Sequence, residues 1–417
     1  MLQLWIQLPL VARYGLLAIA GMLAGGLANH AIYTWCWFPR PISPWVGREV
    51  LGRSRRWADR IPLVGWLLRR PESAALGTGF WVRPLLVETA LALAFPALYW
   101  FHCVAGGLLP EAARDPGVMA AQAGWFHQVF LLHACLLTLM TAATFIDFDE
   151  QTIPDLITVP GTLLALACGA ATPLVWMPVV VEDLLSPVLF FVPGPLDPQW
   201  LGAKGWWLGL TIWTGWCFAL ADRRVILRRG PGKAIRYFFA GLVRHPSWVR
   251  LAAMWVLGLI AVTALWRIGG LAWLGLLTSL IGLAVGGGVV WAVRIVASSA
   301  MRMEAMGFGD VTLMAMIGAT IGWQASLAAF FLAPFAAIGI VLVQYAVTRE
   351  PRVPFGPYLC AGAMMTILGW DAIANGWLLP NIALLGPVLL WLSGLMLILM
   401  AVLLLIWRWI KFTLLGR

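Results

Sequence analysis

Two clusters of acidic residues stand out because they interrupt long apolar stretches of the chain. The first spans residues 146–155 (IDFDEQTIPD), where it ends one apolar stretch and begins the next. The second spans residues 304–310 (EAMGFGD) and precedes another apolar stretch. An ionisable side chain embedded in a membrane is costly unless it is paired or faces water, so both clusters are candidate functional sites.

Two carboxylates held at the same depth would be able to hydrolyse a peptide bond. Like charges close together cannot both ionise, so such a pair shares one proton. The ionised member takes a proton from a water molecule, and the protonated member polarises the peptide carbonyl. Gly307 and Gly309 fit this interpretation, because residues without a Cβ let backbone or substrate approach a carboxylate closely.

Each acidic residue also has a simpler structural interpretation. Asp310 before an apolar stretch is a typical N-cap, and Asp155 directly after a proline is a typical helix start. Asp149 and Glu150 would be solvated residues of a turn, so their neutral variants are predicted to keep most activity. Glu304 would pair with a nearby arginine. The residues alone therefore leave the catalytic interpretation open.

The composition indicates which elements must position these residues. Of the 417 residues, 62% are hydrophobic and 11% are charged, whereas soluble domains average about 25% charged residues. The chain has unbroken apolar stretches long enough to span a bilayer as helices, and it lacks the alternation of a β-barrel. The sequence therefore predicts an all-α, polytopic transmembrane bundle of about 9–11 helices and excludes a soluble enzyme.

The apolar stretches give the bounds of the predicted helices. The longest stretch, residues 311–347, is divided after Gly322 because it is too long for one helix. Several tryptophans are interpreted as interfacial anchors, among them Trp206, Trp207, Trp213 and Trp216. The predicted helices are 11–37, 84–104, 126–146, 156–180, 205–221, 250–268, 271–295, 311–322, 326–347, 355–376 and 381–409.

The basic residues indicate which side of the membrane carries the acidic clusters. Arginines gather in residues 39–83 and 222–250, which the positive-inside rule predicts to be cytoplasmic loops. Threading the chain with its N-terminus outside puts both acidic clusters on the same side as these loops. The loops are expected to contact anionic lipids rather than nucleic acid. Asp147 and Asp310 are therefore expected to face each other at the cytoplasmic boundary of the membrane.

Four segments together resemble the type IV prepilin leader peptidases, membrane aspartic peptidases of bacterial pilus and type II secretion systems. The first acidic cluster is similar to the family's I-D-x-x-x-x-x-L-P-D, and residues 307–313 (GFGDVTL) are similar to G-x-G-D-V-K-L. Residues 354–359 (PFGPYL) are similar to P-F-G-P-[FY]-L, and residues 60–66 (RIPLVGW) resemble the family's first cytoplasmic loop. The resemblance covers about 39–165 and 280–370.

The resemblance implies an aspartic endopeptidase of the bacterial cytoplasmic (inner) membrane, multi-pass, with its active site facing the cytoplasm. It would cut the basic leader from prepilin-like or pseudopilin precursors without a metal or an organic cofactor. Asp147 and Asp310 would be the catalytic pair. The residues expected to shape the site are Gly307, Gly309, Asp155, Glu304, Pro354, Phe355, Gly356 and Pro357.

Three features depart from that family. Bifunctional members carry two C-x-x-C pairs in the first cytoplasmic loop, which imply zinc, and methylate the new N-terminus with S-adenosylmethionine. Residues 39–83 contain no cysteine, so we expect neither that zinc site nor methylation. Thr312 stands where the family usually has lysine, and Asp147 and Asp310 lie 163 positions apart, farther than is usual. Residues 173–270 are therefore predicted to be an insertion that packs to one side of the aspartates.

The predicted organisation has five regions, whose bounds follow from these motifs. They are N-terminal helices with the Arg-rich loop 39–83 (1–104), helices of the first aspartate (105–172), inserted helices with the basic loop 222–250 (173–270), helices of the second aspartate (271–376) and a C-terminal helix (377–417).

Two other functions stay open, as do the substrate's identity and the oligomeric state. A presenilin-like intramembrane protease shares G-x-G-D but needs a P-A-L motif after both aspartates. Here the P-A-L string, residues 96–98, precedes them. A non-enzymatic transporter or assembly scaffold would explain the extra helices, with the aspartates as a coupling or capping pair.

Overall fold

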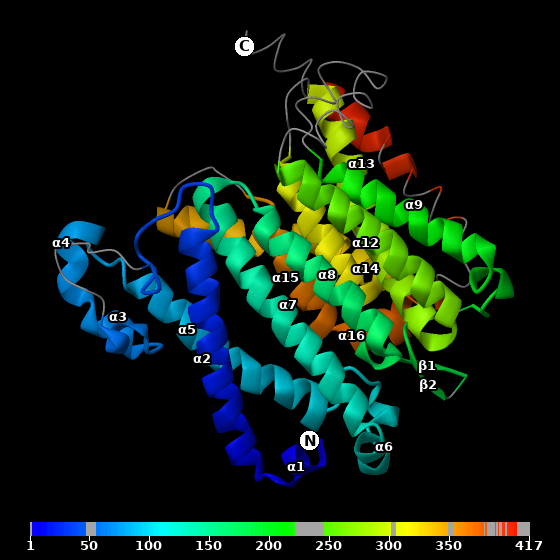
Figure 1. The fold of residues 1–417 in the computed structure, drawn as a ribbon, viewed down its shortest axis with the longest axis horizontal. Coiled ribbons are helices and arrows are strands. Elements are labelled where there is room, and N and C mark those ends of the chain that lie inside the picture. Colours follow the sequence, from blue (N-terminus) through cyan, green and yellow to red (C-terminus); the bar gives the residue numbers. More distant parts are fainter. Residues whose placement is uncertain are drawn as a thin grey trace.

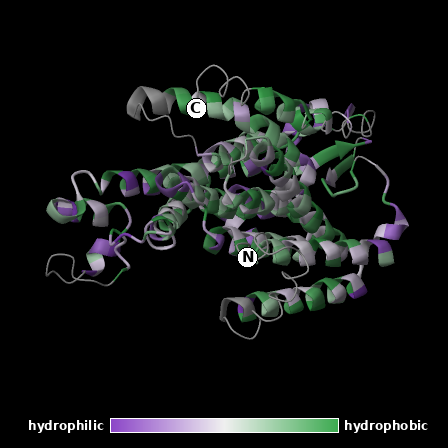
Figure 2. Cartoon of the chain, turned by 90° about the horizontal axis from the view of Figure 1, so that it is seen from above, coloured by the Kyte–Doolittle hydropathy of each residue, from purple (hydrophilic) through white to green (hydrophobic). Residues whose placement is uncertain are grey.

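Long apolar helices make up most of the structure. The computed structural model describes residues 2–46, 56–182, 184–192, 194–221, 246–301, 306–348, 354–378, 380–381, 388, 391, 394–396 and 398–406. Six helices within these residues are long and apolar enough to cross a membrane: Leu10–Thr34, Val82–Val104, Ala123–Glu150, Val249–Ile268, Gly270–Met301 and Phe308–Leu342. Figure 2 shows that the long helices are predominantly hydrophobic. The predicted all-α polytopic fold is confirmed.

The N-terminal helices form a group at one side of the bundle (Figure 1). Within it, α2 packs against α5 and α7. A Cβ on Gly21 would collide with the carbonyl of Leu91, and one on Gly25 would lie 2.6 Å from the Cα of Glu88. Glycines thus bring the α2 and α5 backbones into close contact, as small residues do between membrane helices. The helices are α1 (Leu2–Gln7), α2 (Leu10–Thr34), α3 (Val64–Leu68), α4 (Ser73–Leu76) and α5 (Val82–Tyr99).

The central bundle joins segments that are far apart in the sequence. Here α14 contacts α13, α15, α8 and α7. A Cβ on either Gly282 or Gly318 would collide with the carbonyl of the other, so α13 and α14 lie backbone to backbone. As predicted, α14 is interrupted at Gly322, whose φ is 84°. The helices are α6 (Pro116–Ala121), α7 (Ala123–Glu150), α8 (Asp155–Ala171), α13 (Gly270–Met301), α14 (Phe308–Thr348), α15 (Gly356–Leu368) and α16 (Trp370–Ile373).

The described helices of the predicted insertion, α9 (Ala203–Ala219) and α12 (Pro246–Ile268), pack on one side of the bundle. They contact each other and α13, and in Figure 1 they lie beside α13 and away from α2. The prediction of lateral packing is confirmed for these two helices. The interfacial prediction is wrong for Trp213 and Trp216, which are buried; the Trp213 indole donates to the carbonyl of Trp255 at 2.9 Å.

The helix predicted at 156–180 is too long, because α8 ends at Ala171. Thr172 is extended (φ −159°), and its hydroxyl accepts the N–H of Leu174. Pro173 follows, and because it has no N–H to donate, it does not extend the hydrogen-bond ladder of α8. The chain instead forms an antiparallel hairpin of β1 (Pro178–Val181) and β2 (Leu184–Pro187).

Parts of several predicted elements lie outside the described residues. These are residues 47–55 of the Arg-rich loop, residues 222–245 of the second basic loop, residues 302–305 with Glu304, and the C-terminal residues 407–417.

Candidate active site

The first aspartate lies where α7 reverses into α8. Gln151 adopts a left-handed conformation (φ 54°), and its N–H donates to the carbonyl of Asp147 at 2.9 Å. Pro154 then occupies the N-cap of α8, whose first residue is Asp155. The reversal leaves Asp147 buried, at 4% exposure, and Asp155 exposed. The simple interpretation of Asp155 as a helix start is therefore confirmed.

The second aspartate is buried in the first turn of α14. Asp310 is 6% exposed, and because α14 begins at Phe308, Asp310 does not occupy the N-cap. Arg294 of α13 fixes the residues just before this turn, because its Nε donates to the carbonyl of Met306 at 2.8 Å. Its guanidinium carbon lies 5.9 Å from the centre of the Phe308 ring.

The two acidic motifs touch through their backbones. A Cβ on Gly309 would lie 2.8 Å from the Ile153 nitrogen and 3.0 Å from the Ile153 oxygen. Glycine therefore allows the start of α14 to rest on the turn between α7 and α8. A Cβ on Gly307 would meet the Asp310 Oδ2 at 3.6 Å, which is ordinary contact.

One cavity of about 700 Å³ connects the two motifs. Its lining includes both buried aspartates, although 163 positions separate them in the chain. The sequence-predicted residues that line it are Asp147, Asp155, Gly307, Gly309 and Asp310. The structure thus brings together five of the predicted site residues, and Glu304 lies outside the described residues.

The P-F-G-P segment reaches the first aspartate through its glycine. The Gly356 N–H donates to the Asp147 Oδ2 at 2.9 Å. A Cβ on Gly356 would lie 2.7 Å from that same oxygen, so the residue must lack a side chain. Pro354 and Pro357 are buried next to it, whereas Phe355 is 42% exposed.

A further wall of the cavity comes from the end of α2 and was not predicted. Trp35, Cys36 and Trp37 line it. The Glu150 carboxylate accepts the N–H groups of Trp37 at 2.7 Å and Phe38 at 3.0 Å. The interpretation of Glu150 as a solvated turn residue is therefore wrong, and nothing local in the sequence signals a contact across 113 positions.

The neighbouring Asp149 is also engaged by side chains. It forms ion pairs with Arg40 at 3.1 Å and Arg83 at 2.8 Å, and Arg83 also donates to the carbonyl of Phe145 at 2.8 Å. Asp149 is exposed, as a solvated residue would be, but it lies in the last turn of α7 and is paired. Both acids anchor N-terminal segments next to the cavity.

Two buried polar atoms at or near this site lack a hydrogen-bond partner in the part of the chain that the structure describes. The Asp310 Oδ1 and the Tyr358 hydroxyl are buried and have no hydrogen-bond partner among the described residues. Buried polar atoms are normally hydrogen-bonded, and a catalytic role is one explanation for an exception. Within the described part of the chain, no group of three or more His, Cys, Asp or Glu side chains is placed to hold a metal ion.

The fold and the site together define a multi-pass membrane protein with a pair of buried carboxylates at helix ends. A model of the type IV leader peptidase family matches residues 246–342, which include Asp310. The motifs and this match support membership of the type IV prepilin peptidase family, as the resemblance predicted. No solved structure gives a significant match to the chain.

Curated relatives carry the same family description. A prepilin leader peptidase/N-methyltransferase of Aeromonas hydrophila is 34% identical over 118 residues, which are 27% of this chain and 39% of the relative. A protein of the same name from Stutzerimonas stutzeri is 35% identical over 123 residues, or 26% of this chain and 42% of the relative. The matched residues thus span about two fifths of the length of these relatives.

Proposed function

We propose that this protein is an aspartic endopeptidase that removes the basic leader from prepilin-like or pseudopilin precursors. The observation that carries the proposal is the convergence of Asp147 and Asp310 on one cavity at the ends of apolar helices. Both carboxylates are buried, and both lie in motifs that resemble those of the family. Similarity to that family supports a peptidase, while the aspartic chemistry is inferred from the cavity.

The proposed reaction uses the two carboxylates as one unit. The ionised carboxylate takes a proton from a water molecule, whose oxygen attacks the scissile carbonyl carbon. The protonated carboxylate donates a hydrogen bond to the carbonyl oxygen as it gains negative charge. When the tetrahedral intermediate collapses, a proton passes to the leaving amine and the peptide C–N bond breaks. Because the proton belongs to the pair, we assign neither aspartate as the permanent acid.

The site is proposed to face the cytoplasm of a bacterial inner membrane. The support is the basic residues next to it: Arg40 and Arg83 pair with Asp149 beside the cavity, and cytoplasmic loops are enriched in such residues. The Arg-rich segments are proposed to contact anionic lipid headgroups. We propose no nucleic acid as a binding partner.

We further propose that the protein does not methylate its product. The relatives are named both as peptidases and as N-methyltransferases, but residues 39–83 lack any cysteine that could hold zinc as a thiolate. Mass spectrometry of the mature N-terminus tests this point. A methyl group added only when this protein is present would contradict it.

The central experiment incubates the purified full-length protein with a panel of prepilin-like precursors and identifies the cut by mass spectrometry. Cleavage at the junction of the leader and the apolar helix is the expected result. Cuts inside the apolar helix would indicate an intramembrane protease of the presenilin type. No cleavage of any precursor by folded protein would leave the transporter or scaffold function in its place.

A further inference from the structure

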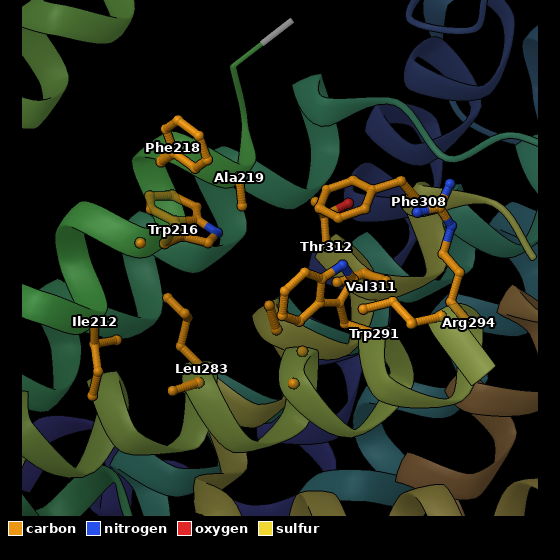
Figure 3. Close-up of a pocket in the computed structure, with 16 residues that line it drawn as sticks. Ile212, Trp216, Phe218, Ala219, Leu283, Trp291, Arg294, Phe308, Val311 and Thr312 are labelled. Atoms are coloured by element: carbon orange, nitrogen blue, oxygen red, sulfur yellow. The ribbon is translucent and has the colours of Figure 1, made fainter. Parts of the chain in front are cut away.

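An apolar groove runs along the membrane-spanning helices beside the candidate active site. Its volume is about 610 Å³, and its walls come from α9, α13 and α14. Figure 3 shows the side chains of Trp216 from α9 and Trp291 from α13 turned toward the space between them. On α13 the lining extends from Leu283 to Ile295, which is roughly 18 Å of helix at 1.5 Å per residue.

The groove and the aspartate cavity are neighbours that share a wall residue. Phe308 lines both the groove and the cavity that holds Asp147 and Asp310. Val311 and Thr312, which directly follow Asp310, also line the groove. A chain lying in the groove would therefore present one end to the carboxylates and extend from there into the membrane.

Two glycines in the groove have no explanation in the protein's own packing. A Cβ on Gly215 of α9 or on Gly288 of α13 would meet nothing within 4 Å. Gly287 differs, because its Cβ would lie 3.0 Å from the Ala315 Cβ, so contact between α13 and α14 accounts for it. Bare backbone on a membrane helix allows another helix to approach closely, and in these two cases that helix is not one of the described helices.

We infer that this groove seats the apolar helix of the precursor, on the C-terminal side of the bond that is cut. This inference rests on the proposed peptidase function and specifies how the site selects its substrate. The α9 wall lies outside the segment 246–342 that the family model matches. The inserted helix α9 thus forms one wall of the groove. Selection among precursors would therefore depend on a helix that is specific to this chain.

A lipid chain is the main competing occupant, and the polar contacts at the mouth of the groove disfavour it. A cation at the mouth would stabilise the phosphate of a bound phospholipid whose acyl chain lay in the groove. Among the described residues that line the groove, the cation is Arg294, which already donates to the Met306 carbonyl and lies against the Phe308 ring. The open glycines and the shared wall at Phe308 are features that a helical substrate uses and a lipid does not.

The test fills the groove without disturbing the fold. Gly288→Leu places a side chain in open space inside the groove. Gly339→Leu is the matched control, because Gly339 is an exposed glycine of α14 that also has nothing within 4 Å and is absent from the groove lining. Each full-length variant is assayed on a precursor with its apolar helix and on a soluble peptide that contains only the leader junction.

The two substrates separate groove binding from chemistry. For Gly288→Leu, kcat/KM is expected to fall about 10-fold more on the helical precursor than on the peptide, while Gly339→Leu matches the wild type on both. Equal losses on both substrates, or no loss on either, would overturn the groove inference while leaving the peptidase intact. If the wild type cuts neither substrate, the proposed function itself fails.

Photo-crosslinking identifies the occupant directly. A photoreactive residue in place of Phe218, which lines the groove on α9, is expected to attach to the apolar helix of the precursor. An adduct confined to lipid, or to a second copy of this chain, in the presence of saturating precursor would refute the inference.

Discussion

Buried carboxylates in two regions of this protein have opposite polar surroundings. Glu88 of α5 is 2% exposed. It accepts hydrogen bonds from the Leu63 N–H at 2.6 Å, the Trp66 indole at 2.7 Å and the Asn29 amide at 3.2 Å. Asp310 is similarly buried, yet its Oδ1 accepts no hydrogen bond from any described residue. Burial alone therefore does not separate a structural acid from a candidate catalytic one.

The difference lies in where the acceptor capacity of each carboxylate is used. The Glu88 carboxylate accepts its hydrogen bonds from the protein itself. The donors lie on α2, on α3 and in the turn before α3. That turn holds Leu63 at a positive φ of 61°, which is unfavourable for a residue with a bulky side chain. In the aspartate pair, the Asp310 Oδ1 accepts no hydrogen bond from the described residues, so it is able to form one with another group. A water molecule and a scissile carbonyl are such groups in the proposed reaction.

The largest effect is expected from the aspartate pair. Asp147→Asn and Asp310→Asn should each lower kcat/KM by at least about 1,000-fold, and the double variant should be no worse, because members of one catalytic unit are not additive. The melting temperature should stay equal or rise, since each change removes a poorly compensated buried acid. Cleavage assays beside thermal unfolding in detergent check both parts. Substantial activity in either single variant would refute the dyad.

Much of the fold was predictable from local signals. Continuous apolar stretches located the helices, and Gly322 located the break in α14, because both depend on neighbouring residues. The acidic motifs located the ends of α7 and α14, because burying an ionisable group in a membrane is costly wherever it occurs. These signals required no knowledge of which helices touch.

The remaining features depend on contacts between distant segments. The Glu150 contact with Trp37 spans 113 positions, and the Gly356 contact with Asp147 spans 209. No periodicity encodes such pairings, so the sequence indicated a solvated turn where the structure has an anchored one. The hairpin of β1 and β2 was missed for a related reason: its residues are apolar enough to resemble the end of a helix.

Glu88→Gln should show the reverse of the aspartate result. In the variant, the amide N–H₂ group faces one of the three donors. The folded state should therefore lose about 1.5–3 kcal/mol, the range for hydrogen bonds to charged groups. Activity per folded molecule should stay within about threefold of the wild type, because Glu88 is absent from the lining of the aspartate cavity. Denaturant unfolding and active-site-normalised rates measure the two effects. A large loss of rate without a loss of stability would erase the distinction between the two regions.

Glycine substitutions should probe how tightly the aspartates are positioned. Gly356→Ala places a methyl group 2.7 Å from the Asp147 Oδ2, so the carboxylate must move; a displacement of this kind costs about 100-fold in rate. Gly307→Ala is the matched control, because its Cβ meets the Asp310 Oδ2 at an ordinary 3.6 Å and should cost less than about threefold. Rates on the same precursor compare them. Equal effects would mean that contact with the carboxylate is not what requires glycine at position 356.

The smallest effects should come from the acids that anchor the N-terminal wall of the cavity. Glu150→Gln keeps one acceptor for the N–H groups of Trp37 and Phe38, and Asp149→Asn weakens ion pairs with partly exposed arginines. Each should cost less than about 1 kcal/mol of stability. A rise in KM of about two- to fivefold is expected, because the wall loosens while the aspartates stay in place. Glu111→Gln, which alters an exposed acid outside the cavity lining, is the control.

Cys36 provides a readout of the wall that does not depend on catalysis. It lines the cavity, and burial, followed by the Glu150 charge, raises the pKa of its thiol. Loosening the wall and removing that charge both lower this pKa, so more thiolate is present at a given pH. Glu150→Gln should therefore speed alkylation of Cys36, followed peptide by peptide with mass spectrometry, whereas Glu111→Gln should not. If the two variants react at the same rate, Glu150 does not hold the wall, and the solvated turn predicted from the sequence describes it better than the anchored one.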